Sequence, residues 1–98
     1  MKILALEHEL PEAAAGTFRR FAEEESRKVW DLHQAGIIRE LYFRADRNEA
    51  VLVLECESVS DAQELLSMLP FVQNNLIAFE IIPLKAYSGF ERLFATNK

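Results

Sequence analysis

Residues 37–57 read IIRELYFRADRNEAVLVLECE, and this stretch decides the fold. Two runs rich in β-branched, aromatic and apolar residues, 37–44 and 50–57, flank the polar segment 45–49. This pattern is typical of two antiparallel strands joined by a turn. The stretch therefore predicts a β-hairpin.

Helical patterns lie on both sides of the hairpin. Residues 17–35 carry apolar side chains at three- and four-residue steps, and Gly36 follows as a natural helix stop. Ser58 can cap a second helix with Asp61 three residues later, and that apolar stripe continues until Pro70. We therefore expect one helix before the hairpin and one after it.

Short apolar runs at residues 3–9 and 76–84 predict an outer strand at each end of this arrangement. The element order β-α-β-β-α-β predicts an α+β, ferredoxin-like domain, with both helices on one face of a four-stranded antiparallel sheet. We expect one domain over residues 1–98, with residues 86–98 as a short helical tail.

The composition limits the partners and the compartment. A formal net charge of −5 and a pI near 5.0 disfavour nucleic acid, which binds mainly through Lys and Arg. No apolar run is long enough to span a membrane, residues 1–10 lack the features of a signal peptide, and Cys56 has no disulfide partner. We expect a cytoplasmic protein without nucleic-acid or membrane partners, without a metal and without a cofactor.

Strand alternation predicts what each face of the sheet carries. If the hairpin turns at 45–49, Leu41 lies opposite Val53, while Leu52 and Leu54 belong to the other face. The richer apolar face, expected under the helices, carries Leu4, Leu6, His8, Ile38, Glu40, Tyr42, Arg44, Leu52, Leu54, Cys56, Ile77, Phe79 and Ile81. The bare face is expected to carry Ile3, Ala5, Glu7, Arg39, Leu41, Phe43, Val51, Val53, Glu55, Ala78, Glu80 and Ile82, with Arg39 and Glu55 as an ion pair.

The bare face mixes large apolar groups with charges. Because monomers seldom expose apolar patches above a few hundred Å², we expect two sheets to stack face to face in a homodimer. The alternative is that the tail at residues 87–95 folds over the sheet of its own chain.

Four side chains form the candidate site. Glu25 interrupts the apolar stripe of the first helix, so burial should raise its pKa; the alternative is that it reaches a basic neighbour at a helix end. His8, Tyr42 and Arg44 are expected on the helix-covered face near the same edge. Glu25 or His8 would move a proton, Arg44 would hold a carboxylate and Tyr42 would donate a hydrogen bond, although a lone His is more often structural.

Three further residues have simpler interpretations. Trp30 lies off the stripe and is expected to meet the tail or a partner, and His33 is expected to cap the first helix. Cys56 is expected to be a small core residue. Heme binding through His8 or His33 is open but carries no motif.

The chain resembles the muconolactone isomerase family of dimeric α/β barrels over most of its length. The residues that carry the resemblance are Leu10-Pro11, Glu23-Glu24-Glu25, Gly36, Arg39 with Leu41, Ser58-Val59 and Leu69-Pro70. The resemblance implies a ferredoxin-like fold, sheet-to-sheet dimers that can assemble further, and proton transfer that shifts a double bond in a carboxylate-bearing lactone without a cofactor. Glu25 matches an acidic position of the family, whereas Glu40, Tyr42 and the tail depart from it.

The function expected from the residues and the resemblance is isomerisation of a small carboxylate-bearing lactone or enol. Two alternatives stay open, namely a non-catalytic small-molecule-binding or assembly module and a cofactor-free oxygenase. In each case the expected partners are a second copy of the chain and a small organic acid or lactone.

Overall fold

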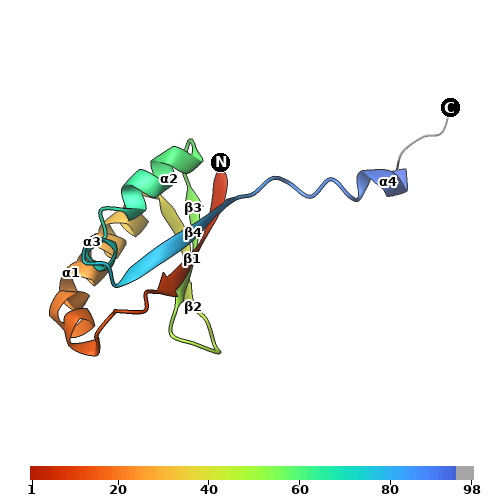
Figure 1. Ribbon diagram of the computed structural model, residues 1–98. Helices are drawn as coiled ribbons and strands as arrows, with labels where there is room; N and C mark the ends of the chain where they lie inside the picture. Colours follow the sequence, from red (N-terminus) through yellow and green to blue (C-terminus); the bar gives the residue numbers. More distant parts are fainter. Residues whose placement is uncertain (95–98) are drawn as a thin grey trace.

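Four strands form one antiparallel sheet, and the helices that precede the last strand pack against one of its faces (Figure 1). The computed structural model describes residues 1–94. The strands, in the sheet order β2-β3-β1-β4, and the helices are β1 (Lys2–Glu9), α1 (Ala15–Gln34), β2 (Ile38–Phe43), β3 (Ala50–Glu55), α2 (Val59–Leu66), α3 (Pro70–Gln73), β4 (Ile77–Pro83) and α4 (Glu91–Phe94). The predicted α+β, ferredoxin-like fold is confirmed.

The ends of the two long helices follow the predicted local chemistry. Gly36 follows the C-cap of α1 with a φ of 78°, a left-handed conformation that costs glycine little. Ser58 Oγ accepts a hydrogen bond from the Asp61 N–H at 3.0 Å and caps α2. Pro70, expected to end this helix, instead begins a separate short helix, α3, because α2 already ends at Leu66.

The core lies between α1, α2 and the sheet. Leu52 and Leu54 of β3 are buried beneath the helices, as predicted. The core residues are Ile3, Ala5, Leu32, Ile38, Leu52, Leu54, Cys56, Ala62, Leu66 and Leu69. Burial of this apolar area supplies the main free energy that holds the helices on the sheet.

The predicted face of β1 was wrong by one residue. Ile3 pairs with Leu54 and Ala5 with Leu52, so both side chains share the helix-covered face and are fully buried. Leu4, Leu6 and His8 therefore belong to the bare face, and Glu7 belongs to the helix side. Small Ala5 under the helices permits the close approach that a leucine would prevent.

A bulge in β2 makes the predicted hairpin pairing wrong as well. Ile38 pairs with Leu54, but the next pair is Glu40 with Val53, so Arg39 is an extra residue on the edge strand. Its guanidinium donates to the Gly36 carbonyl. Beyond the bulge the alternation is reversed, because Leu41 pairs with Leu52 and Phe43 pairs with Ala50. Leu41 and Phe43 therefore face the helices, while Glu40 and Tyr42 face away.

The bare face is a mixed surface. The predicted ion pair of Arg39 with Glu55 is wrong, because the Glu55 carboxylate pairs with the amino group of Met1 at 2.5 Å. The register gives this face Leu4, Leu6, His8, Glu40, Tyr42, Val51, Val53, Glu55, Ala78, Glu80 and Ile82.

The tail leaves the body of the domain beyond β4 (Figure 1). Tyr87, Phe90, Leu93 and Phe94 are exposed along it, and α4 lies near its end. The alternative that the tail folds over the sheet of its own chain is therefore wrong for residues 87–94. Residues 95–98 of the predicted tail lie outside the described part. None of the helices in residues 1–94 has the length and hydropathy needed to cross a bilayer.

Candidate functional site

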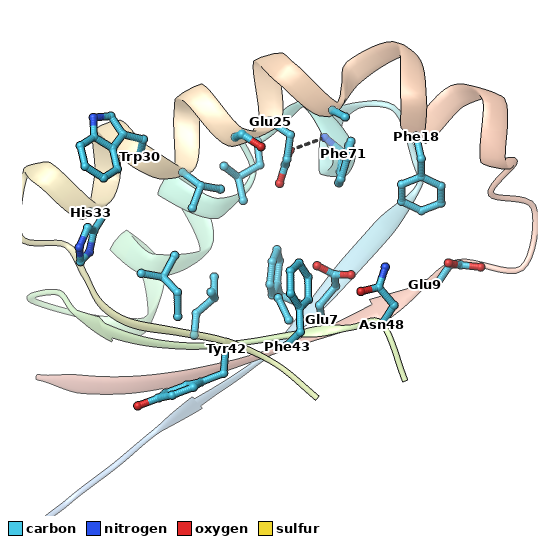
Figure 2. Close-up of a pocket in the computed structure, with 18 of the residues that line it drawn as sticks. Glu7, Glu9, Phe18, Glu25, Trp30, His33, Tyr42, Phe43, Asn48 and Phe71 are labelled. Carbon is cyan, nitrogen blue, oxygen red and sulfur yellow. Dashed lines mark hydrogen bonds between the residues drawn. The ribbon is translucent and has the colours of Figure 1, made fainter. Parts of the chain in front are cut away.

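A cavity of about 940 Å³ lies between α1 and the sheet (Figure 2). Its walls are mainly apolar and aromatic, with a few polar groups, as in many small-molecule sites. The apolar lining consists of Ala15, Phe18, Ala22, Val29, Trp30, Leu41, Phe43, Ala50, Leu52, Leu69, Phe71 and Phe79. The polar lining consists of Glu7, Glu9, Arg19, Glu25, Ser26, His33, Tyr42 and Asn48.

Glu25 lines this cavity from the middle of α1. The residue is only 8% exposed, and its Oε1 accepts a hydrogen bond from the Phe71 N–H at 2.9 Å. Phe71 lies in the first turn of α3, whose N-cap Leu69 has no side-chain acceptor. Desolvation raises the pKa of Glu25, and the Phe71 hydrogen bond partly opposes that rise. The partner is thus a main-chain N–H rather than the basic neighbour considered above.

Glu7 is a second carboxyl group in the cavity. It lies on β1, and burial raises its pKa to about 7. A hydrogen bond with the Ala50 main chain lowers that pKa, whereas the charges of Glu25, Glu49 and Glu9 raise it further. The sequence interpretation missed Glu7 because it placed β1 one residue out of phase. The available signal was the small side chain of Ala5, which shares its face with Glu7.

The two carboxyl groups come from opposite walls. Figure 2 shows Glu25 pointing from α1 toward the sheet and Glu7 pointing from the sheet toward α1. The charge of Glu25 contributes to the raised pKa of Glu7, so the protonation of one carboxyl group depends on that of the other. One group can then act as a base while the other acts as an acid.

Aromatic rings shape the space beside this pair. The rings of Phe18 and Phe71 meet edge to face, with centroids 5.1 Å apart and an interplanar angle of 85°. Phe43 lines the cavity but remains 70% exposed, so its ring stands at an open side. Such walls favour a flat ligand with faces that can stack.

Glu49 joins the hairpin to the end of β1. Glu49 Oε2 accepts a hydrogen bond from the Glu9 N–H at 2.8 Å. The pairing of β1 with β3 ends at Leu6, so this bond connects the two segments where the sheet no longer does. Arg47 lies 3.6 Å from the other carboxylate oxygen. This contact, which the sequence did not predict, fixes the strand end that carries Glu7.

The predicted grouping of four residues around one pocket was wrong. His8 lies on the bare face, with Nε2 3.7 Å from Glu80 Oε1, because β1 has the opposite phase. Tyr42 borders the cavity, but its ring points away from it (Figure 2). The cause is the bulge at Arg39, which exchanges the two faces of β2 relative to the prediction. The Tyr42 hydroxyl donates a hydrogen bond to Glu40 Oε1 at 2.7 Å.

Arg44 is also absent from the cavity lining. Its guanidinium donates to both carboxylate oxygens of Asp46, at 2.8 and 2.6 Å, on the exposed hairpin turn. Glu25 is therefore the one member of the predicted set whose side chain is buried at the cavity, and its catalytic role stays a prediction.

The other residues singled out in the sequence have defined positions. His33 Nδ1 lies 2.8 Å from the Ile38 carbonyl oxygen, and both Trp30 and His33 line the cavity. Cys56 is buried, and burial raises the pKa of its thiol. Within residues 1–94, no three His, Cys, Asp or Glu side chains are grouped so that they could hold a metal ion.

Comparison with known proteins relates this chain to others through its fold. No protein-family model and no curated protein sequence matches it. A similar solved structure is 5-chloro-2-hydroxyhydroquinone dehydrochlorinase from Burkholderia phenoliruptrix AC1100, in complex with 2,5-dihydroxybenzoquinone. The TM-score is 0.63 at 16% sequence identity, over 91% of this chain and 98% of that one. The chain therefore shares the overall α+β fold of that structure.

Proposed function

We propose that this chain is a cofactor-independent enzyme that moves a proton on a flat, mainly apolar organic substrate. The observation that carries the proposal is a pair of carboxyl groups, the buried Glu25 and the partly buried Glu7, which line one cavity and both have raised pKa values. General acid–base catalysis at neutral pH needs groups whose pKa lies near neutrality, and desolvation raises the pKa of Glu7 to about 7 and raises that of Glu25.

The pair suits a double-bond shift next to a carbonyl. The ionised carboxylate removes a proton from the carbon beside the carbonyl, and the C–H electron pair enters the conjugated system as a dienolate. The protonated carboxyl then returns a proton at the far carbon of that system, so the double bond moves and no atom is gained or lost. Each carboxyl ends in the state in which the other began.

The charges in the cavity refine the proposed substrate. The Arg44 guanidinium is hydrogen-bonded to the Asp46 carboxylate outside the cavity, whereas Arg19 is an exposed cation on α1 that lines the cavity. A substrate carboxylate would therefore bind at Arg19, away from the glutamate pair, and the reacting ring itself would be uncharged. A lactone or an enol in a flat ring fits both the acid–base pair and the aromatic walls.

The structural neighbour gives limited support of the same kind. The compound in that enzyme's name and the ligand bound in its structure are both oxygenated six-membered rings, which are flat and enolisable. At 16% identity we carry over only the idea of a flat oxygenated ring.

Deuterium incorporation tests the proposal. Purified protein is incubated in D₂O with β,γ-unsaturated γ-lactones, with and without a carboxymethyl group, and NMR follows exchange at the carbon beside the carbonyl. We expect exchange and isomerisation with the wild type, and at least a hundredfold loss with Glu7→Gln or Glu25→Gln. Glu24→Gln, an exposed neighbour on α1, is the matched control and should be unchanged. Equal rates in all four proteins would refute the proposal.

Two other functions give different results in the same experiments. A non-catalytic binding module would bind 2,5-dihydroxybenzoquinone but would exchange no proton. A cofactor-free oxygenase would consume oxygen with phenolic substrates, which an oxygen electrode detects.

We also propose that two copies pair through the bare face of the sheet. Leu4, Val51, Val53 and Ile82 lie on this face and remain only partly covered within one chain. The stacking of two such faces would remove this apolar surface from water.

A further inference from the structure

The cavity has a second polar position, away from the two glutamates. Trp30 and His33 lie near the end of α1 and line the cavity, with ring centroids 6.1 Å apart and planes inclined by 52°. Figure 2 shows both side chains at one end of the cavity, with Phe18 at the other end and Glu25 between them. An indole beside an imidazole offers an apolar face next to a polar atom.

The main chain fixes the hydrogen-bonding role of this imidazole. His33 Nδ1 lies 2.8 Å from the Ile38 carbonyl oxygen, which can only accept a hydrogen bond. Nδ1 must therefore carry the hydrogen, and Nε2 of the neutral ring is an acceptor. No side chain or main-chain group within residues 1–94 donates to this Nε2.

The distance between the two polar positions sets the length of a ligand that could use both. Glu25 and His33 are eight residues apart on α1, which corresponds to about 12 Å along the helix axis. A single six-membered ring is too short to contact both side chains. The cavity volume of about 940 Å³ lies at the upper end of the range for drug-sized ligands.

We propose that His33 Nε2 accepts a hydrogen bond from a hydroxyl or N–H group at the distal end of an elongated ligand with two or more fused flat rings. The rings pack against Trp30, and the reacting ring lies between Glu7 and Glu25. The position of the reacting ring rests on the proposed function, whereas the distal hydrogen bond is a separate binding contact. His33 thus selects for ligand length and for a donor at the far end.

Two naphthalenes test this contact by calorimetry at pH 8, with the full chain. Both carry a carboxylate that is proposed to bind at Arg19, so the opposite end lies toward His33. The first, 6-hydroxy-2-naphthoic acid, has a donor at that end, and the second, 6-methoxy-2-naphthoic acid, has none there. We expect the wild type to bind the hydroxy acid about five to ten times more tightly, the usual value of one additional hydrogen bond.

Two substitutions separate the contact from a structural role of the ring. His33→Asn keeps an N–H near the position of Nδ1, and hence the bond to the Ile38 carbonyl, but has no atom at the position of Nε2. We expect it to bind both probes within about twofold of each other. His33→Gln places an amide oxygen near the position of Nε2 and should recover part of the preference. Circular dichroism checks that both variants are folded.

The results have defined meanings. A preference for the hydroxy acid that persists in His33→Asn overturns the proposal, and so does a wild type that binds both probes equally or neither. Glu25→Gln should keep the His33-dependent preference even though it loses turnover. The deuterium exchange of monocyclic lactones decides the proposed function independently, so failure of one inference is distinguishable from failure of the other.

Discussion

Glu7→Gln should make the protein more stable at alkaline pH. The pKa of Glu7 is raised from 4.5 to about 7, so the folded state keeps its proton between these values while the unfolded state loses it. The stability contributed by the protonated group is complete below about pH 4.5 and is lost as the pH rises through about 7. Gln has the same shape and does not titrate, so this loss disappears in the variant.

The size of the effect follows from the same pKa. At about 1.36 kcal/mol per pH unit, a rise from 4.5 to about 7 corresponds to at most about 3.4 kcal/mol. Glu7 is only partly buried, and solvent screens its charge. We therefore expect the difference in the free energy of unfolding, variant minus wild type, to grow by about 1–2 kcal/mol between pH 4.5 and pH 8.5.

Urea denaturation followed by the fluorescence of Trp30, the single tryptophan, measures this difference at half-unit pH steps. Subtracting the two proteins removes the contribution of the other titrating groups to first order. Glu24→Gln removes an exposed carboxylate from α1 and should give a nearly flat difference curve. A flat curve for Glu7→Gln as well would refute the burial of an ionisable group at this position.

Three further predictions concern the site and the proposed dimer. Glu25→Ala should lower the free energy of unfolding by about 1–3 kcal/mol because the Phe71 N–H loses its acceptor, whereas Glu25→Gln should cost less than about 1 kcal/mol; equal losses by urea denaturation would contradict this. Arg44→Gln should leave the lactone exchange rate within about twofold, because Arg44 is bound to Asp46 outside the cavity; a tenfold loss would make it the carboxylate clamp after all. Val53→Glu should convert a wild-type dimer into monomers in light scattering, and a monomeric wild type at micromolar concentration would remove the dimer proposal.

The sequence predicted the element order, the end of α1 at Gly36 and the cap at Ser58 because these depend on local chemistry. It could not predict the phase of β1. The run Ile3-Leu4-Ala5-Leu6 is apolar at every position, so alternation does not distinguish its two faces. The one-residue error exchanged Glu7 for His8 in the predicted site.

Helical periodicity was the more reliable guide to the site. A carboxylate inside the apolar stripe of a long helix is visible at a period of 3.6 residues, and Glu25 was identified in this way. Its hydrogen-bond partner was not predictable, because Phe71 is 46 residues away and reaches Glu25 only when α3 docks against α1.

The extra residue at position 39 has an evolutionary consequence. Loss of this one codon would restore simple alternation along the edge strand and leave Leu41 and Phe43 facing the helices, because the pairs from Glu40 with Val53 onward keep their register. Loss of one residue between Glu40 and Phe43 would instead exchange the two faces of the strand beyond that point, and the lining of the cavity would change at several positions at once. The effect of a deletion in this strand therefore depends on whether it falls at the bulge, and sequence alignments that ignore the bulge would compare residues from opposite faces.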